Sequence, residues 1–267
     1  MMQKKNKALS GVYVALLMLF LYLPIFVLIV FSFNSSKGYS WTGFSLKWYV
    51  DLFSNELILN SLKNTLIVAL FASVFATVIG ASAAVGVFSM QNKYAKSVIR
   101  SVTNIPLVMP EIVMGISLML LFAFLNMSGF VPLIIAHISF CVPTVFFSVL
   151  PKLRQINKNM YEAALDLGCN PVQAFFKVVL PEIMPGIITG FLMALTYSLD
   201  DFVISYFTAG NVQTLSITIY SMVKKRVSPE INALSTIMFV VVLLVLLVTN
   251  IRSIKTETAK QKKMMHI

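Results

Sequence analysis

Long, nearly uninterrupted apolar runs dominate the hydrophobic pattern of this chain. Six stretches are about 20 residues or longer, the length that a helix needs to cross a bilayer. They cover residues 14–33, the interval between Lys63 and Lys93, and about 105–125, 130–150, 186–208 and 231–251. Backbone polar groups that face lipid must be paired within their own segment, so these stretches predict helices. The expected fold is an all-α membrane protein with six transmembrane helices.

Positive charges divide unevenly between the two sides that six spans would define. Fifteen Lys and Arg residues lie in the two tails and in the loops after the second and fourth stretches, against six on the other side. An excess of Lys and Arg marks the cytoplasmic side of a membrane protein. We therefore expect both termini in the cytoplasm.

The composition agrees with a membrane protein. Of 267 residues, 58% are hydrophobic and 12% charged, and the mean hydropathy is +0.86. Soluble proteins run near 45–50% apolar and about 25% charged. A disordered chain, a nucleic-acid-binding domain and most soluble enzymes are excluded, and the net charge of +11 is better explained by membrane topology than by nucleic acid. The two cysteines, Cys141 and Cys169, are expected to be free thiols.

The second stretch carries small residues at every fourth position. Ala72, Ala76, Gly80 and Ala84 would share one face of a helix. Small residues let helix backbones approach closely within a membrane. This face is predicted to be a buried helix–helix interface.

The connection between the fourth and fifth stretches, residues 151–185, is long for neighbouring helices. Residues 160–167 predict a short helix, which Gly168 would end in a left-handed conformation. Asn170 is placed to cap a second helix, with Pro171 in its first position.

This second helix is expected to end at Pro181 and Pro185, which lead into the fifth stretch. The helical pair needs a cover for its apolar side, supplied either by a partner protein or by its own bundle. The apolar residues concerned are Ala163, Ala164, Leu165, Leu167, Phe175, Phe176, Val178 and Val179.

The spacing within this connection resembles a known motif. Residues 162–164 read Glu-Ala-Ala, Gly168 follows, and residues 178–181 read Val-Val-Leu-Pro. The pattern is similar to the EAA loop of ABC-importer permeases, which ends in Ile-x-Leu-Pro. The resemblance implies that the loop couples to an ATPase through Glu162, Ala163, Ala164, Asp166, Gly168, Leu180 and Pro181.

A wider likeness covers nearly the whole chain. Residues 33–36, 47–49, 198–201, 219–224 and 227–234 resemble the second permease subunits of bacterial spermidine/putrescine importers. The resemblance implies a type I ABC-importer permease fold in a bacterial cytoplasmic membrane. It also implies one permease domain over the whole chain, with a core at about residues 60–251.

The same resemblance implies the partners of the chain. They are a homologous second permease, two ATPase subunits that bind ATP and Mg, an external polyamine-binding protein and membrane lipid. No Gly is followed by Lys anywhere in the sequence, so the phosphate-binding loop of an ATPase is absent. The chain itself is expected to be a transport subunit and not an enzyme, without a cofactor or a metal site of its own.

Three acidic residues lie inside the predicted spans: Glu111, Asp200 and Asp201. A charge at the centre of a span costs about 2.5–3.5 kcal/mol. None of the six stretches contains Lys or Arg, so these acids have no internal cation. We expect each carboxylate to be neutral, to face a watery cavity or to receive a cation from outside.

Organic cations are suited to such a site. A carboxylate beside an aromatic ring can bind an ammonium group by ion pairing and cation–π attraction together. Polyamines carry several ammonium groups on a flexible apolar chain. The candidate substrate-binding or gate residues are Asp200, Asp201, Ser198, Tyr197, Glu111 and Trp48.

Each candidate also has a structural interpretation. One aspartate could bind backbone groups at an unwound turn or contact the second permease. Glu111, close to Pro106 and Pro110, could reach the cytoplasmic interface, and Trp48 could belong to an interfacial aromatic belt. His137 has no acidic neighbour in its own stretch and is interpreted as structural.

A basic cluster, Lys224, Lys225 and Arg226, departs from the charge distribution. It lies in the outer segment 215–227, which predicts a short interfacial helix. We expect this segment to contact the external binding protein or lipid headgroups.

Other functions stay open at the level of sequence. An ABC permease for another cationic or small organic solute, or for iron, would carry the same coupling loop. An ion-coupled secondary transporter would use the acids to carry protons and would show an inverted repeat, which the sequence does not display. A receptor or scaffold without transport would leave the acids unexplained.

Overall fold

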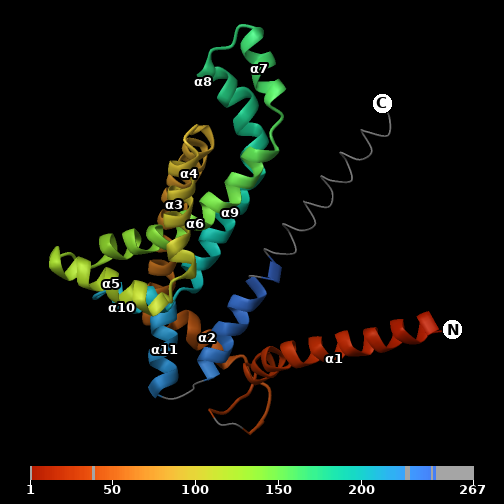
Figure 1. Cartoon of the computed structure of the whole chain (residues 1–267). Coiled ribbons are helices and arrows are strands. Elements are labelled where there is room, and N and C mark those ends of the chain that lie inside the picture. The colour runs from red at the N-terminus through yellow and green to blue at the C-terminus, as the bar shows by residue number, and fades with distance from the viewer. Residues whose placement is uncertain (1, 38–39, 226–228, 242, 245–267) are drawn as a thin grey trace. The chain divides into compact units, whose positions relative to one another are not determined.

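The computed structural model describes residues 2–37, 40–225, 229–241 and 243–244 (Figure 1). Within these ranges the ordered elements are helices, and the only pairing of β type is an isolated bridge between Asn34 and Phe44. The chain divides into two compact units, Leu57–Thr218 and a smaller one made of Met1–Glu56 and Ile219–Ile267.

The larger unit contains the packed core. Its elements are α3 (Glu56–Ser89), α4 (Lys93–Val108), α5 (Glu111–Phe124), α6 (Phe130–Gln155), α7 (Lys158–Asp166), α8 (Pro171–Ala174), the π-helix η1 (Phe175–Val179), α9 (Leu180–Asp200) and α10 (Val203–Thr208). Helix α6 packs along α9, and α10 packs against both α5 and α6.

The small-residue face of α3 is buried, as predicted. Ala72, Ala76 and Ala84 are fully buried, and a Cβ added to Gly80 would lie 2.8 Å from the Val142 carbonyl oxygen of α6. Helix α9 approaches α6 almost as closely through its two glycines, Gly186 and Gly190. Small residues on α3 and α9 thus allow both helices to approach the α6 backbone closely, as is typical of membrane interfaces.

Replacing Gly80 with alanine should lower the melting temperature of the detergent-solubilised protein. The new methyl group would collide with α6, and overpacking of this kind costs about 1–3 kcal/mol. Gly86 on the same helix is the matched control, because a Cβ there meets nothing within 4 Å. Gly86→Ala should be neutral or stabilising through helix propensity. Equal melting temperatures for the two variants would contradict the close contact between α3 and α6.

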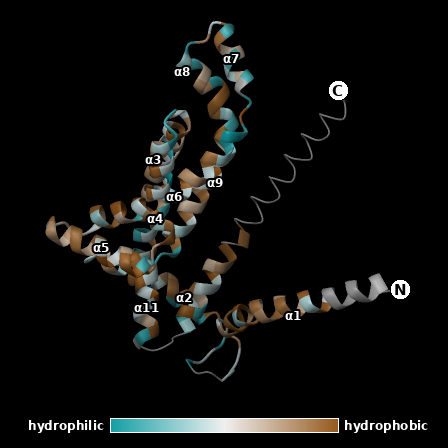
Figure 2. Cartoon of the chain, viewed as in Figure 1, coloured by the Kyte–Doolittle hydropathy of each residue, from teal (hydrophilic) through white to brown (hydrophobic). Residues whose placement is uncertain are grey.

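The smaller unit contains α1 (Met2–Phe31) and α2 (Lys47–Ser54). Helix α1 is hydrophobic over most of its described surface (Figure 2), and its apolar window is not buried within the chain. Helix α11 (Leu215–Lys225) confirms the predicted helix in the segment 215–227 and crosses the boundary between the two units. Arg226 lies outside the described residues.

Four described helical segments are long and apolar enough to cross a membrane: Gly11–Phe31, Glu56–Ser89, Phe130–Gln155 and Pro171–Asp200. The bent pair α4 and α5 would add a fifth span if it crosses as one. The sixth predicted stretch is described only at its start, where Pro229–Val241 form an apolar helix.

The third and fifth predicted stretches are helical, as expected, but each is broken into two helices. Helices α4 and α5 are separated at Met109–Pro110, and the chain bends by 102° between them. Proline removes an amide donor and disfavours the helical conformation of the residue before it. The second break lies at Asp201, whose ψ of 126° ends α9 before α10 begins.

The long connection at residues 151–185 is mostly helical. Helix α6 continues through Pro151, and the helical run from Pro171 to Asp200 passes both Pro181 and Pro185 without ending. The expectation that these two prolines close the helix was therefore wrong. The five-residue π-helix η1 immediately precedes Leu180 and Pro181, and its wider turn shifts the hydrogen-bond register where proline has no amide donor.

The turn inside this connection is as predicted. Gly168 adopts a φ of +86°, and the Asn170 side chain caps α8 in a reciprocal capping box with Gln173. The amide of Gly168 donates to the Leu165 carbonyl, and that of Cys169 to the Ala164 carbonyl. This is a Schellman motif, which joins α7 to α8 with a fixed geometry.

Candidate functional site

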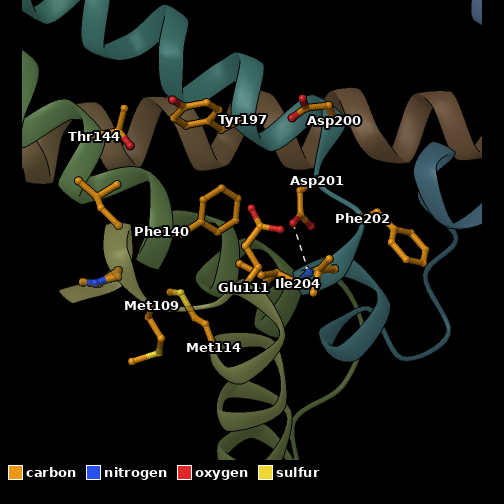
Figure 3. Close-up of a pocket in the computed structure, with 13 residues that line it drawn as sticks. Met109, Glu111, Met114, Phe140, Thr144, Tyr197, Asp200, Asp201, Phe202 and Ile204 are labelled. Atoms are coloured by element: carbon orange, nitrogen blue, oxygen red, sulfur yellow. Dashed lines mark hydrogen bonds between the residues drawn. The ribbon is translucent and has the colours of Figure 1, made fainter. Parts of the chain in front are cut away.

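The breaks in the two interrupted spans border one cavity of about 570 Å³ (Figure 3). Helices α4, α5, α6, α9 and α10 all contribute to its wall. The lining residues are Pro106, Leu107, Met109, Glu111, Met114, Phe140, Thr144, Tyr197, Asp200, Asp201, Phe202, Val203 and Ile204. Four of the six predicted site residues are therefore brought together.

The cavity wall combines acids with aromatic rings. Glu111, Asp200 and Asp201 line it, and so do the rings of Phe140 and Tyr197, whereas the described lining residues include no Lys or Arg. Three carboxylates on the wall of one partly open cavity produce a negative potential that attracts cations. The rings offer faces against which an ammonium group or a methylene chain can lie.

Asp200 and Glu111 are the accessible acids of the cavity. Asp200 is the last residue of α9, and Tyr197 lies one turn earlier on the same helix with 42% of its surface exposed. Glu111 begins α5 immediately after the Pro110 break, where the positive end of the helix dipole favours a carboxylate. Both acids are exposed, so a solute that enters the cavity can reach them.

Asp201 has a different environment, although it is adjacent in sequence. Its side chain is 6% exposed, and its carboxylate accepts hydrogen bonds from the amides of Ile204 at 3.2 Å and Ser205 at 2.7 Å. The Asp201 carbonyl accepts a further bond from the Ser216 hydroxyl at 2.6 Å. The interpretation that one aspartate binds backbone groups at an unwound turn is confirmed for Asp201.

His137 of α6 connects the groups around this break. Its Nε2 lies 3.5 Å from the Asp201 carboxylate and 3.0 Å from the Ser205 hydroxyl. Its Nδ1 lies 2.7 Å from the Ser198 hydroxyl, and the ring is almost completely buried. Sequence reasoning missed this acidic partner because it comes from another helix. The only signal was that His137 is the one residue of its apolar stretch whose side chain can carry a positive charge.

The remaining two predicted site residues do not line the cavity. Ser198 is buried beneath it and contacts His137. Trp48 belongs to the smaller unit, where its indole N–H donates to the Asn34 carbonyl at 2.6 Å. The ammonium groups of Lys37 and Lys47 lie 5.5 and 5.6 Å from the centroid of this ring.

The α7–α8 hairpin lies at the end of the larger unit opposite helices α5 and α10 (Figure 1). Its apolar side chains divide into two groups. Ala174 is buried and Val179 packs on the core, whereas Leu167, Val172 and Phe176 are 87%, 65% and 59% exposed. The bundle therefore covers only part of this apolar surface.

Comparison with known proteins identifies the family. Residues 76–252 match the family described as binding-protein-dependent transport system inner membrane component. The chain belongs to this family. The resemblance to ABC-importer permeases that the EAA loop predicts is thereby confirmed.

Two relatives in Escherichia coli K12 are similar to this chain over most of its length. The spermidine/putrescine transport system permease protein PotC is 38% identical over 249 residues, which cover 92% of this chain and 94% of PotC. The putrescine transport system permease protein PotI is 38% identical over 232 residues, covering 82% of this chain and 81% of PotI. The predicted likeness to spermidine/putrescine permeases is confirmed.

Solved structures of this class share the fold. A bacterial ABC transporter involved in the import of the acidic polysaccharide alginate superposes with a TM-score of 0.77 at 16% identity, covering 92% of this chain and 96% of the other. An amino acid ABC transporter with histidines gives 0.54 at 17% identity, covering 76% and 98%. The all-helical architecture is that of ABC-importer permeases.

Proposed function

We propose that this chain is a permease subunit of an ATP-driven importer of polyamines, spermidine and putrescine. The observation that carries the proposal is the cavity in which Glu111, Asp200 and Asp201 meet aromatic rings without a lining Lys or Arg. The 38% identity to PotC and PotI supports the same substrate class. A polyamine supplies the ammonium groups that the acids lack and methylene groups that pack on Phe140 and Tyr197.

Transport requires partners that this chain does not provide. A homologous second permease would complete the translocation pore, and an external binding protein would deliver the polyamine. Two ATPase subunits, with ATP and Mg, would supply the energy. The cavity would then alternate between the two sides of the membrane, and ligand binding can drive this change only as far as its affinity differs between the two states.

The α7–α8 hairpin is proposed as the contact with the ATPase. Leu167, Val172 and Phe176 are exposed there and need a partner surface. The proposed coupling residues in and beside the hairpin are Glu162, Ala163, Ala164, Asp166, Gly168, Leu180 and Pro181. Movement of the ATPase subunits would reach α6 and α9 through this rigid turn.

The proposed topology follows from the same assignment. The chain would have six spans of a type I ABC-importer permease, with both termini in the cytoplasm of a bacterial cell and membrane lipid around the bundle. It would form one permease domain, with the core at about residues 60–251 and the coupling loop at 151–185. The subunit would carry out no covalent chemistry.

A ligand panel tests the substrate class. In proteoliposomes that contain the complete complex and its binding protein, spermidine or putrescine should stimulate ATP hydrolysis about tenfold or more. The uncharged 1,4-butanediol and ferric iron should have no effect, because neither combines an alkyl chain with ammonium groups. Stimulation by iron or by a neutral solute, with none by polyamines, would refute the proposal.

A further inference from the structure

His137 joins three parts of the larger unit across the break that separates Asp200 from α10. From α6 it reaches Ser198 in the last turns of α9, Asp201 at the break and Ser205 in the first turn of α10. Both nitrogens of the imidazole are therefore engaged, one toward each side of the break.

The break at Asp201 needs side-chain hydrogen bonds across it because it interrupts the backbone hydrogen bonds of a helix. Asp201 replaces two of the lost acceptors by receiving the amides of Ile204 and Ser205. Its carboxylate is then buried, and a buried carboxylate requires further donors or a positive partner. Among the described residues, His137 Nε2 is the one nitrogen of a His, Lys or Arg side chain that lies within 4.0 Å of this carboxylate.

His137 itself does not line the cavity. It lies one turn before Phe140, whose ring is 5.2 Å from the imidazole and does line the cavity. The neighbouring Asp200 is exposed at the cavity. The imidazole is therefore placed to orient the wall of the cavity without touching its contents.

We propose that His137 is a positioning residue for cation binding, which holds the α9–α10 break in the form that presents the Asp200 carboxylate to the cavity. The inference rests on the proposed function in that Asp200 is taken to contact the transported cation. His137 acts through Ser198, Asp201 and Ser205, and a polar side chain of similar reach can take its place.

The test is a double-mutant cycle on ligand affinity. Equilibrium dialysis measures the binding of radiolabelled spermidine to the purified permease–ATPase complex, without the binding protein, whose own affinity would mask that of the cavity. We expect His137→Leu to raise the Kd about tenfold and Asp200→Asn to raise it about 30-fold. The double variant should stay near 30-fold, because a displaced Asp200 and an uncharged one lose the same interaction.

Two further variants separate positioning from general damage. His137→Gln can still bond a serine hydroxyl or Asp201, and should return the Kd to within about threefold of the wild type. Cys141→Ala removes a buried α6 side chain whose thiol contacts the Ala194 carbonyl of α9 away from the break. This control should leave the Kd unchanged even if it lowers the melting temperature.

Each outcome has a defined meaning. An increase of about 300-fold in the double variant, or a wild-type Kd for His137→Leu, would overturn the positioning role. A wild-type Kd for Asp200→Asn would instead refute the proposed cation site. If the complex does not assemble with His137→Leu, Ser205→Ala is the variant to use instead. It removes only the hydrogen bond between His137 Nε2 and the Ser205 hydroxyl. It should raise the Kd about threefold, and an unchanged Kd would overturn the inference.

Discussion

Replacing Asp200 with asparagine should reduce polyamine uptake at low substrate concentration about 30-fold, with an unchanged amount of assembled complex. Asp200 is exposed at the cavity, and asparagine has nearly the same shape. The substitution therefore removes a charge opposite the ammonium group without leaving a buried void. Uptake of radiolabelled spermidine into proteoliposomes gives the rate, and gel filtration of the purified complex gives its amount.

Asp201→Asn is the matched comparison, and it should lower the stability of the complex instead of its affinity for the polyamine. One oxygen of the buried carboxylate would become an amide N–H₂ facing the amide of Ile204 or Ser205, so two donors would oppose each other. Leaving a buried donor unpaired costs about 1–3 kcal/mol. We expect a lower melting temperature and less assembled complex. If both variants transported at the wild-type rate, the cavity would not be the polyamine site.

Replacing Gly168 with valine should abolish most uptake while the helices of the bundle remain folded. The residue has a φ of +86°, where a β-branched side chain is strained by about 2 kcal/mol or more, which corresponds to a factor of about 30 in the population of the native turn. No heavy atom lies within 4 Å of an added Cβ, so the effect would come from backbone strain and not from a clash. A displaced α7–α8 hairpin would no longer meet the ATPase.

Gly168→Asn provides the control for this prediction. Asparagine tolerates positive φ far better than valine, and should retain uptake within about threefold of the wild type. Copurification of the ATPase with each variant reports whether the contact survives. Full uptake and normal ATPase binding by Gly168→Val would show that the geometry of this turn does not matter for coupling.

The elements that could be predicted from the sequence depend on local chemistry. The small-residue face of α3, the left-handed Gly168 and the Asn170 cap each follow from residues within a few positions of one another. Helical periodicity, backbone sterics and capping act over one or two turns, so a sequence pattern displays them directly. The acidic character of the cavity was also predictable, because any charge within an apolar run requires a partner.

The roles within the site could not be predicted in the same way. Asp200 and Asp201 are equivalent in the sequence, yet one is exposed at the cavity and the other holds the break together. His137 and Asp201 are far apart in the chain and meet only because α6 packs against α9 and α10. Trp48 was grouped with the acids as an aromatic residue of the first predicted outer loop, and it lies in the other compact unit.

By itself, the sequence determined the membrane class, the helical content, the turn at Gly168 and the family. Only the tertiary structure decided where two spans break, that the breaks border one cavity, and which aspartate is accessible there. The reason is physical. Helix formation and capping are set by neighbouring residues, whereas a carboxylate's role depends on the burial and donors that distant helices supply when they pack.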